Sequence, residues 1–163
     1  MRVIKDNKVI DDNWQIVEGS AIESGLPAGD VILPFSVWQS NREAILSWND
    51  RKLGLLINGE HDIDDLAGDL DHFNIIAIEF PAFKDGRGYS QARILRDHYD
   101  YSGDLRAVGD VLRDQLYFMQ RCGISSFLIK EEKDIEDAIR GFSDFSVKYQ
   151  TAADGAEPLY KQR

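Results

Sequence analysis

The residues best suited to chemistry lie between positions 74 and 123, in two polar loops that contain glycine. The first loop reads KDGRGYS and contains Asp85 and Arg87, and the second reads GDVLRDQ and contains Asp110 and Arg113. An arginine beside a glycine-rich backbone suits a small oxyanion, and a loop aspartate can act as a general acid or base. We therefore expect the catalytic side chains to be Asp110, Arg113 and Asp85.

The ligand-binding residues are expected in and around the first loop. Its arginine would hold an oxyanion with a two-pronged guanidinium, and backbone N–H groups of the glycine turn would add hydrogen bonds. A glutamate ends the apolar run that precedes the loop, and a tyrosine hydroxyl can donate a hydrogen bond. The predicted set is Arg87, Gly86, Gly88, Tyr89, Ser90, Glu79 and Arg93.

Each assignment has a structural alternative. The first loop can be only a tight turn, with Arg87 paired to Asp110 or Glu79. Asp110 can instead cap the helix that we expect over residues 111–122. Arg113 would then lie in the first turn of that helix, where a cation opposes the helix dipole unless it faces a carboxylate or an anionic ligand. The sequence leaves these alternatives open.

Standard cofactor motifs are missing from the sequence. The first loop resembles a phosphate-binding glycine loop, but no Lys-Ser/Thr follows a G-x-x-x-x-G, and Gln91 stands where a dinucleotide loop has its third glycine. No cysteine set for an iron–sulfur cluster and no haem motif are present. His61 and His72 have no second ligand at metal-binding spacing, so we expect no metal site. The cofactor is therefore left undefined.

Strands that alternate with helices must position these loops. Apolar runs predict five strands, at residues 31–33, 53–57, 75–79, 105–108 and 126–130. Capping residues and helical periodicity predict five helices, over residues 36–48, 62–73, 111–122 and 134–142 and from Ser90 onward. This alternation indicates an α/β fold with a parallel sheet.

The strand count best fits a doubly wound, flavodoxin-like sheet of about five parallel strands with helices on both faces. A partial (βα) barrel is the alternative, because only the strand order distinguishes the two folds. In both folds the loops that follow the strands meet at one edge. We expect the loops at residues 58–59, 80–90, 109–113 and 130–134 to do so.

The 163 residues predict one α/β domain. Residues 1–17 predict a peripheral β-hairpin, and residues 145–163 lose periodicity and form a tail. Aromatic residues near the ends need cover from the same domain or from a second copy, which makes a homodimer one alternative. They are Trp14, Phe35, Trp38, Phe142, Phe145 and Tyr149.

Composition limits the partners. With 29 acidic and 19 basic side chains the net charge is -10, which opposes binding to nucleic acid or anionic membranes. The single cysteine, Cys122, cannot form an internal disulfide, and we expect it to be a core thiol. The sequence has no apolar run of membrane-spanning length and no secretory leader, so we expect a cytoplasmic protein.

Five segments carry a resemblance to a known family. They read VILPFSVWQSNRE, LGLLING, IIAIEFPAFKDGRGYSQARILR, GDLRAVGDVLRDQLYFMQRCG and DAIRGFSDFSVKYQ. Over nearly its whole length the chain resembles a bacterial family catalogued as domain of unknown function 934, or DUF934. The resemblance implies an oxidoreductase or redox-associated protein of assimilatory sulfite reduction, with a small sulfur oxyanion as ligand. The alternative is a non-catalytic accessory or interaction protein of sulfite reductase.

Overall fold

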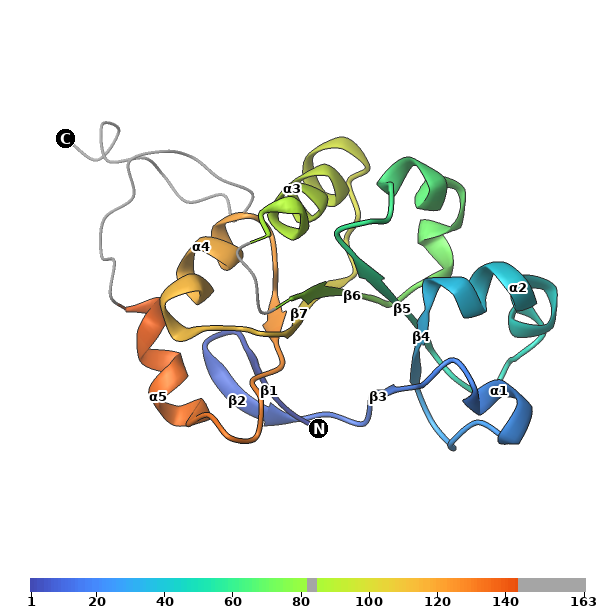
Figure 1. The fold of residues 1–163 in the computed structure, drawn as a ribbon, viewed down its shortest axis with the longest axis horizontal. Helices are drawn as coiled ribbons and strands as arrows, with labels where there is room; N and C mark the ends of the chain where they lie inside the picture. The colour runs from blue at the N-terminus through green and yellow to red at the C-terminus, as the bar shows by residue number, and fades with distance from the viewer. Residues whose placement is uncertain (82–84, 144–163) are drawn as a thin grey trace.

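A computed structural model describes residues 1–81 and 85–143 (Figure 1). The predicted tail at 145–163 lies outside the described residues, and so do Phe145 and Tyr149. No helix among the described residues is long and apolar enough to cross a membrane.

One sheet of eight strands organises the described chain, in the order β2-β1-β8-β7-β6-β5-β4-β3. Strands β3 to β8 run parallel to their neighbours, whereas β1 is antiparallel to both β2 and β8. The five predicted strands are confirmed as β4 to β8. The strands are β1 Arg2–Lys5, β2 Lys8–Asp11, β3 Gln15–Ile16, β4 Val31–Pro34, β5 Leu53–Asn58, β6 Ile75–Phe80, β7 Asp104–Gly109 and β8 Ser126–Phe127.

The predicted flavodoxin-like sheet is wrong, because β4 to β8 lie side by side in the order of the sequence. A doubly wound sheet reverses its strand order part-way, which places helices on both faces. Right-handed crossovers that always add the next strand on the same side place every helix on one face. Figure 1 shows α2, α3 and α4 outside the curve of the strands. A sequential parallel order is the one that the alternative, a partial (βα) barrel, requires.

The helices are short, and several are not α-helical. Asp62 and Asp134 cap η1 and α5, because their carboxylates accept hydrogen bonds from backbone N–H groups two residues on. The elements are α1 Ala21–Ser24, α2 Phe35–Leu46, the 3-10 helix η1 Ile63–His72, α3 Arg87–Arg93 with its π-helical extension η2 Ile94–His98, the 3-10 turn η3 Arg113–Gln115, α4 Leu116–Arg121, α5 Ile135–Ile139 and the 3-10 turn η4 Arg140–Phe142.

The strands bury side chains on both faces of the sheet. On the convex face, Leu55, Ile76 and Ala107 pack with the helices in the main core. The concave face has a smaller core formed by Ile32, Ile75, Ala77 and Val108, with Trp14, Leu56 and Leu128 packed against it. Because side chains alternate along a strand, burial on both faces explains the nearly continuous apolar runs in the sequence.

The N-terminal hairpin is part of the sheet. Asp6 and Asn7 form its turn with φ of 51° and 58°, as a two-residue turn of type I′ requires. Val3 and Ile4 are fully buried, and Ile4 pairs with Phe127 of β8. The hairpin therefore lies at one edge of the sheet and extends it by two strands.

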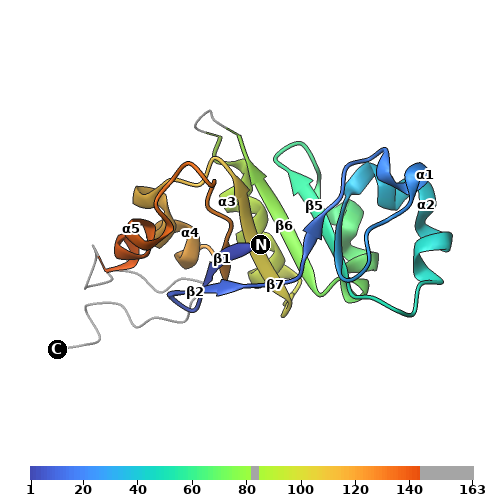
Figure 2. The same ribbon diagram turned by 90° about the horizontal axis from the view of Figure 1, so that it is seen from below.

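The two edge strands of the sheet, β2 and β3, are close together along the chain. Only residues 12–14 separate Asp11 at the end of β2 from Gln15 at the start of β3. This linker spans at most about 14 Å, whereas the edges of a flat sheet of this size would lie roughly 33 Å apart. The sheet must therefore curl. Figure 2 shows the chain leaving the hairpin and crossing the open side of the curve toward α1 and α2.

Inside the curve, Arg106 of β7 binds the linker. Its side chain is only 2% exposed, and its Nε donates to Ser126 Oγ at 2.9 Å. Its Nη2 forms an ion pair with the carboxylate of Asp12 in the linker and lies 3.4 Å from Asp104 Oδ2. This cluster, which we call the Arg106 clasp, ties the linker between the two edge strands to the middle of the sheet.

Replacing the buried guanidinium should destabilise the fold strongly. Arg106→Met removes the ion-pair partner of the Asp12 carboxylate, whereas Asp104 keeps Ser125, Ser126 and Lys5. We expect the free energy of unfolding to fall by about 3–5 kcal/mol in urea titration. Arg2→Met is the control, because its exposed pair with Glu136 is worth about 1 kcal/mol or less. Equal losses in the two variants would show that the clasp has no special role.

Candidate functional site

Two groups of polar side chains lie at the carboxyl ends of the strands. The first, the β5–β6 pocket, follows strands β5 and β6. The second, the Asp110–lysine cluster, follows β7 and β8. Because these strands are parallel, both groups lie at the same edge of the sheet, where curled and open α/β folds place their ligand sites.

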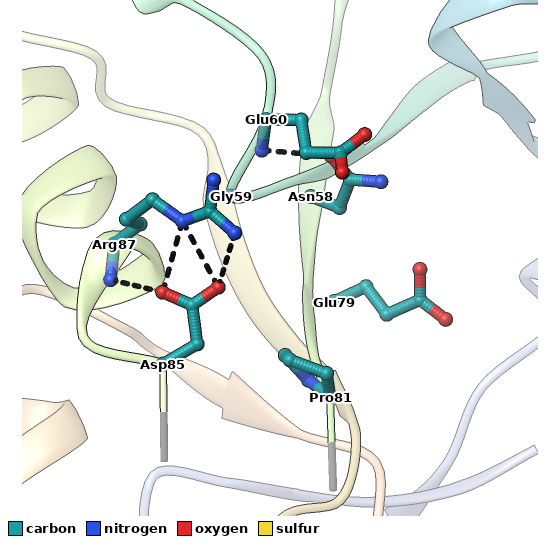
Figure 3. Close-up of a pocket in the computed structure, with 7 residues that line it drawn as sticks. All are labelled: Asn58, Gly59, Glu60, Glu79, Pro81, Asp85 and Arg87. Atoms are coloured by element: carbon teal, nitrogen blue, oxygen red, sulfur yellow. Dashed lines mark hydrogen bonds and ion pairs between the residues drawn. The ribbon is translucent and has the colours of Figure 1, made fainter. Parts of the chain in front are cut away.

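The β5–β6 pocket has a volume of about 350 Å³ (Figure 3). It brings together Glu79, Asp85 and Arg87, three of the residues that the sequence singled out. Arg113 and Asp110 do not line it. The described lining residues are Asn58, Gly59, Glu60, Glu79, Pro81, Asp85 and Arg87.

Arg87 forms a two-pronged ion pair with Asp85. Its Nη2 lies 2.7 Å from Oδ2, and its Nε lies 3.0 Å from both carboxylate oxygens. The hydrogen bonds from Arg87 lower the pKa of the Asp85 carboxyl, and the same pair raises the pKa of the arginine. The structural alternative, in which Arg87 forms an ion pair within the protein, is thus confirmed. Its partner, however, is Asp85 and not Asp110 or Glu79.

A buried glutamine fixes the turn that forms one wall of this pocket. Gln91 of α3 is 5% exposed, and its Nε2 donates to the carbonyls of Asn58 and His61 at 2.7 and 2.8 Å. The Nδ1 of His61 accepts from the Asn58 N–H at 3.0 Å, and Asn58 Oδ1 accepts from the Glu60 N–H at 2.9 Å. The loop at residues 58–59 was predicted from the Asn-Gly pair after an apolar strand, but the role of Gln91 in holding it was not.

Of the two glycines of the first loop, only Gly88 serves packing. A Cβ on Gly88 would lie 2.8 Å from Phe80 Cε1, so this glycine lets α3 approach the ring. Gly86 has φ of -79°, and a Cβ there would meet nothing within 4 Å. The Tyr89 ring lies between Phe80 and Phe118, with ring centroids 5.1 and 5.2 Å away. Burial raises the pKa of the Tyr89 phenol, which makes it a poor proton donor.

Ser90 and Arg93 lie outside the pocket lining. The prediction that Ser90 caps the helix is wrong, because α3 begins at Arg87 and Ser90 is exposed within it. The side chain of Asp85 instead accepts from the Arg87 N–H at 3.0 Å. Arg93 pairs with Asp97 one helical turn on, at 3.0 Å.

Asp110 is placed by the glycine before it. Gly109 has φ of +88°, and a Cβ there would lie 2.3 Å from the Phe80 carbonyl oxygen, so a side chain would clash. The Asp110 N–H donates to that same oxygen at 2.8 Å. Its Oδ1 lies 3.3 Å from Lys133 Nζ and 3.6 Å from Lys130 Nζ. Asp110 therefore does not cap a helix as predicted, because the chain stays extended to Leu112 before η3 begins.

Arg113 pairs with Asp137 of α5, at 3.4 Å. A Cβ on Gly141 would lie 2.4 Å from the Arg113 carbonyl oxygen, so η4 packs directly on this turn. The carboxylate alternative for Arg113 is therefore confirmed. The structure does not bring Arg113 into the pocket of Arg87, and the expected pair of anion-binding arginines is not formed.

The family model described as "Bacterial protein of unknown function (DUF934)" matches residues 54–160, more than half of the chain. The chain belongs to DUF934. No curated protein matches it. The part matched as DUF934 includes strands β5 to β8, and therefore both polar groups at their carboxyl ends.

The Asp85–Arg87 pair should be visible in a titration. We expect NMR to show that Asp85 titrates below the ordinary carboxyl pKa of about 3.9, and that Arg87→Met moves it back toward this value. Because the folded pKa is lowered, the pair stabilises the protein above the ordinary carboxyl range and stops doing so as pH falls through the folded pKa. Arg93→Met is the matched control, and an unchanged Asp85 pKa in Arg87→Met would contradict the pairing.

Proposed function

We propose that this protein is a redox-associated protein of assimilatory sulfite reduction that binds a small sulfur oxyanion at the carboxyl ends of β7 and β8. The pathway comes from the DUF934 resemblance. The position comes from the Asp110–lysine cluster.

The observation that carries the proposal is the charge balance of this cluster. One carboxylate, Asp110, is shared by the ammonium groups of Lys130 and Lys133. The two lysines keep 42% and 31% of their side chains exposed, so a ligand from solvent can reach them. Two ammonium groups share one carboxylate, so both keep hydrogen-bond donors for an anion that adds oxygen acceptors beside Asp110. The carboxylate of Glu131, which lines the same pocket as the two lysines, opposes that anion.

The predicted arginine site supports an oxyanion less well. Arg87 already binds Asp85, and a free anion beside it would also face the carboxylates of Glu60 and Glu79, which line the same pocket. Like charges in one pocket disfavour binding of an anion. Arg113 is paired with Asp137 away from that pocket. The lysines therefore replace the arginines as the proposed oxyanion ligands.

A non-catalytic accessory protein of sulfite reductase is the second candidate. The net charge of -10 favours it, because an acidic surface steers association toward a basic partner surface. Phe118 adds an exposed aromatic side chain, 57% accessible, on α4. Exposed aromatic residues are enriched at protein interfaces.

Calorimetry with sulfite and sulfate tests the oxyanion site. We expect Lys130→Met and Lys133→Met each to weaken binding by roughly tenfold or more, as loss of a charge-assisted hydrogen bond does. Asp110→Asn should strengthen binding, because it removes the carboxylate that competes with the anion. Arg87→Met is the matched control and should leave the affinity unchanged.

Loss of binding in Arg87→Met, with normal binding in the lysine variants, would return the site to the first loop and contradict the proposal.

Assays of the unmodified protein distinguish an oxidoreductase from an accessory protein. Sulfite-dependent oxidation of a reduced nicotinamide would favour an oxidoreductase. Salt-sensitive association with sulfite reductase in sedimentation, without turnover, would favour the accessory role.

A further inference from the structure

The β5–β6 pocket has a guanidinium edge that is held in place but not used. Asp85 occupies the Nε–Nη2 edge of Arg87, and Nη1 makes no hydrogen bond to any described residue. The arginine side chain is 59% exposed, while Asp85 is only 20% exposed. Because the carboxylate fixes the plane of the guanidinium, the Nη1–Nη2 edge has a defined direction and can bind a second planar anion.

Two carboxylates line the same pocket and have no bonded partner among the residues that the structure describes. The side chains of Glu60 and Glu79 form no hydrogen bond or ion pair within the described chain, although the charge of Glu60 contributes to raising the pKa of Arg87. In Figure 3 Glu79 extends from β6 and Glu60 from the turn after β5, both on the side of the pocket opposite Asp85. The side-chain oxygen of Asn58 is bonded to the Glu60 N–H, so its amide is held in this wall.

The space between these charges depends on Gly59. A Cβ there would lie 3.0 Å from both the Cβ and the Nε of Arg87, and 3.1 Å from Asp85 Oδ2. The turn that carries Gly59 is fixed in turn by Gln91, which bonds the carbonyls on both sides of it. The pocket is therefore formed in advance, with one open cationic edge and two open anionic groups.

This arrangement suits a ligand that carries both charges. A simple anion is repelled by Glu60 and Glu79, and a simple cation is repelled by Arg87. A zwitterion satisfies both sides. We propose that the β5–β6 pocket binds a free α-amino acid, with its carboxylate on the Nη1–Nη2 edge of Arg87 and its ammonium group on Glu60 and Glu79. A volume of about 350 Å³ is at the small end for ligand sites and fits a small side chain.

The test uses matched ligands on the whole protein. Calorimetry with L-alanine, L-serine and L-cysteine should detect binding of at least one of them. For alanine the matched controls are ethylamine, which keeps only the ammonium group, and propionate, which keeps only the carboxylate. We expect each to bind at least about tenfold more weakly than alanine, since each loses one charge-assisted contact.

Variants assign the two charges separately. Arg87→Met should abolish the preference for alanine over ethylamine. Glu79→Gln should reduce the preference for alanine over propionate, and the double change Glu60→Gln with Glu79→Gln should abolish it. Arg93→Met and Glu43→Gln change exposed charges outside the pocket and are the controls, and melting curves confirm that each variant is folded.

The site is independent of the proposed oxyanion site, so the two can fail separately. Lys130→Met and Lys133→Met should bind the amino acid normally, and Arg87→Met should bind sulfite normally. No heat with any of the three amino acids at millimolar concentration, or equal binding of alanine and its two analogues, would overturn the proposal.

Discussion

The fold depends on one constraint, which is that the two edges of an eight-stranded sheet are joined by residues 12–14. A linker this short forces the sheet to curl. The Arg106 clasp stabilises the curl, because a buried guanidinium from the middle of β7 holds Asp12 of the linker, Asp104 and Ser126. A buried ion pair needs its hydrogen bonds satisfied to be stable, and three side chains share that task here.

The carboxyl ends of the parallel strands carry the candidate ligand sites. Arg106 pairs in register with Ala77, so the clasp lies on the same concave face as the smaller core. Met1 connects the clasp with the second polar group, because its sulfur lies 3.6 Å from Arg106 Nη1 and it lines one pocket with Lys130 and Lys133. In folds of this type the amino-terminal end supports stability and the carboxyl-terminal end carries function. The charges agree with this division. The clasp is buried and paired, whereas Glu79, Lys130 and the open edge of Arg87 are accessible to solvent.

Much of this arrangement could be predicted from local sequence. Strands β4 to β8 followed from apolar runs, and the caps Asp62 and Asp134 followed from position, because each lies directly before an amphipathic segment. The grouping of Glu79, Asp85 and Arg87 followed from the rule that parallel strands end at one edge. In each case the information lies within a few residues of the position concerned.

The strand order, the role of Asp110 and the buried Arg106 depend on contacts between residues distant in sequence. The strand order could not be read from β6, because a strand buried on both faces has the same apolar pattern in a doubly wound sheet and in a curled one. The cap predicted at Asp110 failed because the chain stays extended to Leu112, and its carboxylate pairs instead with Lys130 and Lys133, about twenty residues further on. The buried Arg106 gave no signal either, since the apolar residues around it mark an ordinary strand.

The most direct test of this account is a distance measurement across the linker. Spin labels at Lys8→Cys and Glu18→Cys, in a Cys122→Ala background, lie on exposed positions on either side of residues 12–14. If the Arg106 clasp holds the sheet edges together, double electron–electron resonance should give one narrow distribution of the distance between the two labels. Arg106→Met should broaden this distribution and shift it to longer distances. Distributions of equal width and position with and without Arg106 would contradict the account.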